Sequence, residues 1–334
     1  MEMALLREAG LLRHFLAVVA DGSISGAAAR LAVSQPALTK SVRKLETRFG
    51  VPLFERMPRG MALTAFGECL LPHARRIEAE CRFAETEMQA LRGGRAGRLR
   101  LGAGLFFGTA LLPRAIARLR GEFPDLPVEL DVGINELTHP RLFDGELDVV
   151  FCRLPDAGAL PSSILRREFF QIDARIVAGE GHPLLAKPRV AARDLRAYPW
   201  VIYQQDREMI AHVFAAAREA GTEPLRVGTE VKSLFALIQL LRIGPYLSCV
   251  ADPLIRAYPW LGIHAVGYGR PIWRFPGGAL IQRALENYRP VARLVELVRG
   301  EAERLRGARP GALVAATPPR KRARVITRRS SRRR

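Results

Sequence analysis

The sequence predicts an α/β protein of more than one domain, with a helix-rich N-terminal unit, one long helix and a larger region of alternating strands and helices. The chain has 334 residues and 49% of them are hydrophobic, so there is enough apolar material for two or three cores. Apolar residues follow a helical period through the first ninety residues. After a glycine-rich break at residues 93–97, short apolar runs alternate with helical segments, which is typical of α/β folds.

Two short helical patterns meet across a tight break between residues 22 and 50. The first is expected at residues 26–32 with Ser25 as its N-cap, and the second begins at Ser34 and ends before Gly50. The second pattern has an apolar stripe and an opposite polar, basic face. The stripe is Leu38, Val42, Leu45 and Phe49, and the polar face carries Gln35, Thr39, Lys40, Arg43 and Lys44. Such a face suits base edges and phosphates in a DNA major groove, although a merely solvated face is the alternative.

The flanking segments favour the DNA-binding interpretation. A preceding helical pattern places Leu11, Phe15, Val18 and Val19 on one apolar face, which makes a three-helix unit. Residues 53–64 then read as a strand, a turn with Arg56 and Arg59, and a second strand, which together form a wing beside the helices.

Residues 15–67 resemble the winged helix-turn-helix of LysR-type transcriptional regulators. The matching runs are GSISGAAARLAVSQPALTKSVRKLE, PLFER and LTAFGE, and a weaker similarity continues to about residue 305. The resemblance implies a winged helix-turn-helix domain at 1–65, a linker helix and hinge at 66–97, and a two-lobed α/β effector-binding domain at 98–306. In that domain, which resembles type 2 periplasmic binding proteins, lobe I takes 98–168 and 268–306 and lobe II takes 169–267. A basic, disordered tail is expected at 307–334, and it is not part of the family pattern.

This resemblance implies double-stranded DNA with a pseudo-palindromic promoter site as the partner. Base edges are expected at Gln35, Thr39, Lys40 and Arg43, phosphates at Lys44, Arg56 and Arg59, and packing at the helix entrance from Ser34 and Pro36. The working cycle that it implies is a homotetramer whose packing, DNA bend and contact with RNA polymerase change when a small-molecule co-inducer closes the two lobes.

A long helix is expected from its cap at Thr64 to about residue 92. Its apolar positions alternate spacings of four and three, which is a heptad seam. The seam consists of Leu70, Ala74, Ile77, Cys81, Ala84, Met88 and Leu91. We interpret it as a homodimer contact through residues 66–92, and packing on its own chain is the alternative.

The remainder predicts largely parallel sheets whose ligand site lies at the carboxyl ends of the strands. Strands are expected at 99–103, 128–132, 147–152, 172–178, 200–203, 225–231 and 246–250. The candidate effector-binding residues are Phe106, Gly108, Thr109, Ile134, Asn135, Arg153, Gln204 and Ser233. Helix capping is the alternative for Thr109 and Ser233, and a surface or interlobe salt bridge is the alternative for Arg153.

Two of these positions depart from the family pattern. Members that respond to aromatic acids often carry hydroxyl residues where this chain has Phe106 and Ile134, whereas Arg153 matches an arginine that is often found after the third strand. The hypothesis is therefore a ligand with an apolar or aromatic body and at most one acidic group.

Composition favours an acidic polymer as partner and excludes several classes of protein. The net charge is +19, and residues 318–334 alone hold nine Lys or Arg and no Asp or Glu, which suits non-specific attraction to DNA. A solvated extension without a role in binding is the alternative for this segment. No segment resembles an export signal or a membrane span, so a cytoplasmic protein without a membrane partner is expected. Four widely spaced cysteines and six scattered histidines predict free, mostly buried thiols, no metal site and no cofactor.

An enzyme is not expected. Ser41-Val42-Arg43-Lys44 fits the S-x-x-K acyl-transfer pattern, but it lies on the polar helix with no cleft, and chance explains it. The prediction is a sequence-specific transcriptional regulator controlled by a small-molecule effector bound between two lobes. A small-molecule binding protein with only non-specific DNA affinity is the alternative.

Overall fold

The computed structural model describes residues 9–58, 60–91, 98–203, 206–219, 221 and 225–307. Arg59, the glycine-rich break at 93–97, Gln204 and the basic tail beyond residue 307 lie outside the described residues. Within the described part, no helix combines the length and the apolar character that a membrane crossing requires.

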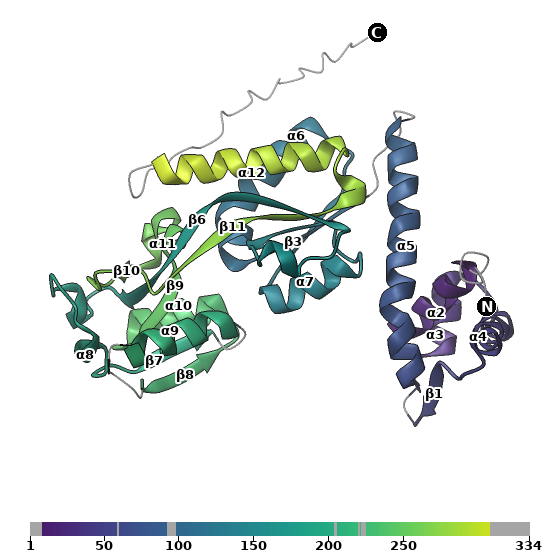
Figure 1. Cartoon of the computed structure of the whole chain (residues 1–334), viewed down its shortest axis with the longest axis horizontal. Coiled ribbons are helices and arrows are strands. Elements are labelled where there is room, and N and C mark those ends of the chain that lie inside the picture. Colours follow the sequence, from purple (N-terminus) through teal and green to yellow (C-terminus); the bar gives the residue numbers. More distant parts are fainter. Residues whose placement is uncertain are drawn as a thin grey trace, which may run out of the picture.

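Three helices and a hairpin form the N-terminal unit (Figure 1). They are α2 (Ala9–Asp21), α3 (Ile24–Leu31), α4 (Gln35–Phe49), β1 (Phe54–Met57) and β2 (Gly60–Leu63). The core is built from one face of each helix and includes the fully buried side chains of Phe15, Leu38 and Leu45. The predicted three-helix unit and hairpin are therefore confirmed.

The ends of α4 are those that the sequence predicts. The Ser34 hydroxyl accepts a hydrogen bond from the Ala37 N–H at 3.3 Å, and Gly50 adopts a left-handed backbone with φ of 71°. Two details of the prediction are wrong. The N-cap of α3 is Ser23, whose hydroxyl accepts from the Gly26 N–H, and Ser25 lies within the first turn. Phe49, expected in the buried stripe, is 37% exposed, because the last turn of α4 extends beyond the core on which its earlier turns pack.

The long helix α5 (Ala65–Leu91) begins at the predicted cap, where the Thr64 hydroxyl accepts from the Gly67 N–H at 3.2 Å. Its predicted seam has two different environments. Leu70 and Ala74 are buried in the N-terminal core, so the first part of the seam packs on its own chain. Further along, Cys81, Ala84 and Met88 are exposed. The side chain of Leu91 lies outside the described residues.

The larger domain is built on a nine-stranded sheet, counted over the described residues, with strand order β4-β3-β5-β11-β6-β9-β7-β8 and β10 paired to β6. The strands are β3 (Leu99–Ala103), β4 (Val128–Val132), β5 (Val149–Arg153), β6 (Ile164–Gly179), β7 (Trp200–Tyr203), β8 (Val227–Val231), β9 (Leu247–Ala251), β10 (Ile263–Ala265) and β11 (Trp273–Gln282). The ranges 99–103, 128–132 and 200–203 match the predicted strands residue for residue.

Pairing within this sheet divides it into two lobes. Parallel pairs join β3 to β4 and β5 on one side, and β7 to β8 and β9 on the other. Between them, the long strands β6 and β11 run antiparallel to each other, and β11 also pairs antiparallel with β5 and β6 with β9. The expectation of largely parallel sheets is thus correct inside each lobe but wrong for the two strands that connect them.

Helices cover the faces of both lobes (Figure 1). They are α6 (Leu112–Glu122), α7 (Asn135–Phe143), α8 (Ala192–Leu195), α9 (Arg207–Glu219), α10 (Leu234–Ile243), α11 (Asp252–Ala257) and α12 (Arg289–Gly307), with short π or 3-10 turns at Phe107–Leu111, Ala157–Ala159, Pro183–Leu185, Pro259–Leu261 and Arg283–Leu285. In lobe I, α12 lies beside α6 although they are far apart in the sequence. The main core runs through both lobes, and the carboxyl ends of β3, β4 and β5 lead into residues that line a pocket shared with lobe II.

Candidate functional site

The outer face of α4 is the first candidate site. Packing of Leu38, Val42 and Leu45 against the core turns the opposite side of the helix to solvent. Of the predicted contact residues on α4 and its cap, Thr39 is half-buried and the others are exposed, namely Ser34, Gln35, Pro36, Lys40, Arg43 and Lys44. The arrangement is a rigid helix whose solvent side carries an amide, a hydroxyl and several cations.

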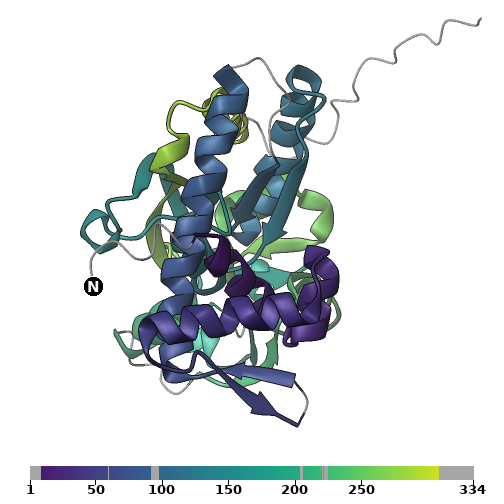
Figure 2. The same ribbon diagram turned by 90° about the vertical axis from the view of Figure 1, so that its right-hand side faces the viewer.

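The hairpin is fastened beside this helix. The Leu53 N–H donates to Glu46 Oε1 at 2.9 Å, which ties the start of the hairpin to α4. At the other strand, the Met61 N–H donates to the Gly22 carbonyl at 2.8 Å. Arg56 is exposed on β1, and Figure 2 shows the hairpin beside the helices at one end of α5. These hydrogen bonds therefore hold the hairpin, which carries Arg56, beside α4.

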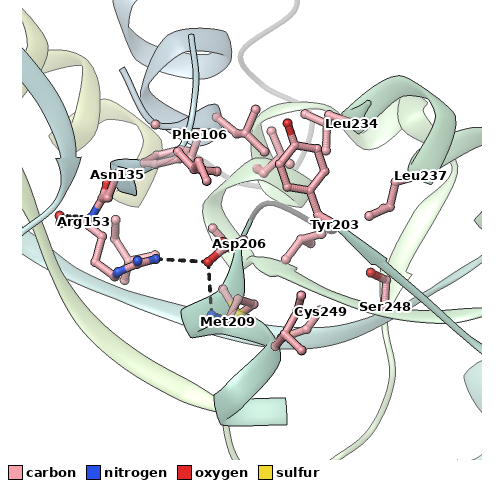
Figure 3. Close-up of a pocket in the computed structure, with 18 of the residues that line it drawn as sticks. Phe106, Asn135, Arg153, Tyr203, Asp206, Met209, Leu234, Leu237, Ser248 and Cys249 are labelled. Atoms are coloured by element: carbon pink, nitrogen blue, oxygen red, sulfur yellow. Dashed lines mark hydrogen bonds and ion pairs between the residues drawn. The ribbon is translucent and has the colours of Figure 1, made fainter. Parts of the chain in front are cut away.

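The second candidate site is a pocket between the lobes, with a cavity of about 120 Å³ (Figure 3). Lobe I contributes the loop after β3 and the start of α7, and lobe II contributes α9, α10 and β9. Most of its lining side chains are apolar, and the larger ones are Leu105, Phe106, Phe107, Ile134, Ile172, Ile202, Met209, Ile210, Val213, Leu234, Leu237, Val250, Leu254 and Phe275. An apolar cavity of similar size, about 150 Å³, accommodates benzene, so this pocket fits a small apolar body.

The structure brings half of the predicted effector residues to this pocket. Phe106, Ile134, Asn135 and Arg153 are among the residues that line it. Gly108 and Thr109 lie in the turn Phe107–Leu111 behind the wall, where the Thr109 hydroxyl donates to the Leu105 carbonyl at 2.6 Å.

Ser233 is also outside the lining, because its hydroxyl accepts from the Ala236 N–H at 3.3 Å and caps α10. Gly108, Thr109 and Ser233 therefore do not line this pocket, and their contact with a ligand stays a prediction. Gln204 lies outside the described residues.

The sequence did not lead us to predict most of the lobe II residues that line the pocket. Met209, Ile210 and Val213 share one face of α9, and this spacing is the signal that could have indicated them. Ile172 and Phe275 come from β6 and β11, whose crossing of the interlobe space depends on long-range pairing. No local pattern in the sequence indicates that these two side chains would face a ligand.

The polar groups of the pocket are largely engaged with the protein itself. The Ser248 hydroxyl donates to the Val201 carbonyl at 2.7 Å, and the Asn135 amide donates to the Arg153 carbonyl at 2.8 Å. The guanidinium of Arg153 is only 11% exposed and pairs with Asp206 and Glu208 at the start of α9. The interior therefore offers a ligand mainly apolar contacts.

Burial also shifts the pKa values of two side chains near Arg153, those of His139 and Cys152. His139 Nε2 lies 3.3 Å from the Cys152 sulfur. Burial, and then the charge of Arg153, lower the pKa of His139 to about 4, so the ring is neutral at pH 7. Burial raises the pKa of the Cys152 thiol to about 12, so it stays protonated. All four cysteines are free, but Cys69 and Cys81 are exposed, which corrects the expectation of mostly buried thiols.

Two protein families match the chain. The family described as "Bacterial regulatory helix-turn-helix protein, lysR family" matches residues 10–68, and the family described as "LysR substrate binding domain" matches residues 92–303. The "SDS degradation transcriptional activation protein" of a Pseudomonas species is 34% identical over 252 residues, which cover 73% of this chain and 80% of that protein.

Solved structures share the whole arrangement. Full-length OxyR from Pseudomonas aeruginosa has a TM-score of 0.68 at 22% identity, covering 87% of this chain and 94% of that chain, which shows the fold. Full-length CbnR complexed with its target DNA has a TM-score of 0.61 at 25% identity, covering 88% of this chain and 99% of that chain. With its helix-turn-helix head and its two-lobed domain both matched, the chain belongs to the LysR family of bacterial transcriptional regulators and carries the DNA-binding and effector-binding domains of that family.

Proposed function

We propose that this regulator reads its operator with the outer face of α4 and is controlled by an apolar small molecule bound between its lobes. The observation that carries the proposal is the pairing of two surfaces of opposite chemistry in one chain. One is an exposed, basic helix face, and the other is a cavity between the lobes that is lined mainly by apolar side chains.

The contacts on DNA follow from the chemistry of each side chain. Gln35, Lys40 and Arg43 are exposed on successive turns of α4 and reach toward base edges, with Thr39 between them. Arg56 on β1 lies to one side of this helix, where the groove wall brings phosphates close, and we assign Lys44 and Arg59 to phosphates as well. Ser34 and Pro36 shape the helix entrance. That CbnR is known in complex with its target DNA supports this use of the head.

The ligand assignment rests on the lining of the pocket. A cavity with so many apolar side chains gains free energy by exchanging water for an apolar body.

We further propose that two chains associate through α5 and that dimers pair into tetramers, which contact RNA polymerase at the promoter in the cytoplasm. The exposed side chains of Cys81, Ala84 and Met88 support an intermolecular contact, because they continue the heptad spacing beyond the region that the head covers. A dimer presents two copies of α4 to the two halves of a pseudo-palindromic site.

Footprinting of the purified protein on the DNA upstream of its own gene tests the proposal. We expect a protected, roughly symmetric site. Gln35→Ala should lower the preference for this site over random DNA, by about 1–3 kcal/mol if a bidentate base contact is lost. Arg56→Ala, the matched control on the hairpin, should weaken binding to both DNAs equally and reduce the salt slope by about one. Equal losses on both DNAs for Gln35→Ala would remove its base-reading role.

A further inference from the structure

Arg153 already pairs with carboxylates of the protein, whereas an arginine that binds an anionic ligand needs donors that are available to it. It stands at the end of β5 in lobe I, and both of its partners come from lobe II. Its Nη1 lies 3.5 Å from Asp206 Oδ1, and its Nη2 pairs with Glu208 (Figure 3 draws the contact to Asp206). The guanidinium also stacks over Trp273, 4.7 Å from the ring centroid. One cation is thus held by two carboxylates and an aromatic ring.

We propose that the ion pairs of Arg153 with Asp206 and Glu208, which we call the clasp, hold the two lobes together. We further infer that the pocket beside the clasp takes an uncharged, apolar molecule. This inference rests on the proposed ligand control and narrows it, because it removes the acidic group from the ligand. Two carboxylates against one guanidinium leave the clasp with a net charge of −1. A ligand carboxylate at this position meets like charge, and the arginine that it would approach already pairs with two carboxylates through Nη1 and Nη2.

Two other polar side chains of the pocket are already engaged with the protein backbone. The Ser248 hydroxyl and the Asn135 amide both donate to backbone carbonyls. His139, whose pKa is lowered to about 4 by burial and then by the charge of Arg153, is neutral at pH 7. An anion that enters this cavity loses its hydration without gaining equivalent hydrogen bonds, whereas an uncharged apolar body does not have this cost.

The clasp also connects directly to the ligand wall. Asp206 caps α9, since its Oδ1 accepts from the Met209 N–H at 3.1 Å. The same helix points Met209, Ile210 and Val213 into the cavity. A ligand that fills the cavity therefore touches the helix whose first turn holds Arg153, and closure of the clasp and contact with the ligand favour the same lobe arrangement.

Matched pairs of small molecules test the ligand class on the full chain without DNA. Benzyl alcohol and benzoate share a ring that fits the cavity, and 1-hexanol and hexanoate share a chain, so each pair differs in charge. Dissociation constants from isothermal titration calorimetry give the ratio of alcohol affinity to carboxylate affinity. We expect the wild type to favour both alcohols by at least about tenfold, the effect of one poorly paired charge.

The double variant Asp206→Asn, Glu208→Gln tests the clasp. The amide that Asp206→Asn introduces retains an oxygen for the Met209 N–H, while the arginine becomes free to meet an anion. The affinity ratio should fall by about tenfold, because the carboxylates gain. Asp131→Asn, Glu146→Gln is the control, since it frees Arg141 of its two carboxylates outside the pocket and changes the net charge equally. This control should keep the wild-type ratio.

Three results would overturn the inference. One is tighter binding of the carboxylates than of the alcohols by the wild type. Another is an unchanged ratio in the clasp variant, or an equal fall in the control, which would show a long-range charge effect. The third is the absence of saturable binding of both alcohols. None of these results changes the footprint on DNA, so failure of the DNA-binding proposal is recognised separately.

Discussion

At the scale of single residues, environment decides what a side chain can do. Arg153 and Arg43 have the same chemistry, but Arg43 is exposed on α4 and Arg153 is nearly buried between two carboxylates. The sequence could indicate that each is a cation near a functional surface. It could not choose between an anion site and a salt bridge for Arg153, because Asp206 and Glu208 lie more than fifty residues further along the chain.

His139 gives a prediction at the same scale. Its pKa in the folded protein is lowered to about 4 from an ordinary value of 6.5, mainly by burial. The unfolded chain therefore binds more protons between these pH values, and stability falls as pH decreases from about 6.5 to about 4. The contribution is at most about 3 kcal/mol. His139→Gln should flatten this part of the stability profile.

The measurement is the free energy of unfolding by urea from pH 7 to pH 4, compared between wild type and variant. Taking the difference between the two profiles removes the carboxylates that titrate in the same range. His264→Gln, on the exposed side of β10, controls for the loss of any histidine. If the His139→Gln profile runs parallel to that of the wild type, the buried neutral ring is not a source of the acid sensitivity.

At the scale of elements, strands with regular apolar patterns were predictable and β11 was not. β7 is apolar throughout and β3 is apolar or small except at Arg100, and both strands lie between parallel neighbours. β11 contains Pro276, Gly277 and Gly278, which are poor strand residues, and its register against β6 shifts between the two glycines. Its extended form depends on pairing with β5 and β6 on its two sides, which is information that a local pattern does not hold.

The helix α5 packs on lobe I, and this contact joins the N-terminal unit to the effector-binding domain within one chain. Ala79 and Phe83 are buried in the core of the larger domain. Beside them, Arg82 donates to the Gly145 carbonyl at 2.7 Å and lies 3.0 Å from Asp148 Oδ1. Gly145 has a φ of 76°, and a Cβ there would lie only 2.2 Å from the Ala79 Cβ. The backbone of Gly145 thus fits directly against α5.

Gly145→Ala should weaken the packing of α5 on lobe I. The left-handed backbone costs any alanine about 1–2 kcal/mol, and the clash with Ala79 adds to it. Gly181→Ala is the matched control, because it has the same kind of backbone (φ of 81°) with nothing within 4 Å of the added carbon. Hydrogen exchange of the α5 amides around residues 75–83 should accelerate in Gly145→Ala only. Adding Ala79→Gly should restore part of the protection, and equal exchange in the two alanine variants would contradict the docking argument.

At the scale of the whole molecule, the heptad seam of α5 shows what a periodic pattern leaves open. The spacing predicts an apolar stripe but not which surface covers it. Leu70 and Ala74 are covered by the chain's own head, whereas Cys81, Ala84 and Met88 are not covered by any described part of the chain. The division of the chain into domains at 65, 97 and 306 stays a prediction, although the two matched families, at 10–68 and 92–303, leave α5 as the segment between them.

This exposed half of the seam gives the last prediction. Met88 is 54% exposed, and an apolar stripe of this kind gains free energy when a second copy of α5 covers it. Ala84→Lys places a charge in the middle of the proposed seam and should dissociate the dimer, whereas Glu85→Lys places the same side chain one position away, on a neighbouring face of the helix. Sedimentation velocity at micromolar concentration should show smaller species for Ala84→Lys only, and its footprint should shrink to weak half-sites, because two heads no longer bind together. Full-sized oligomers of Ala84→Lys would instead place the subunit contact outside this half of α5.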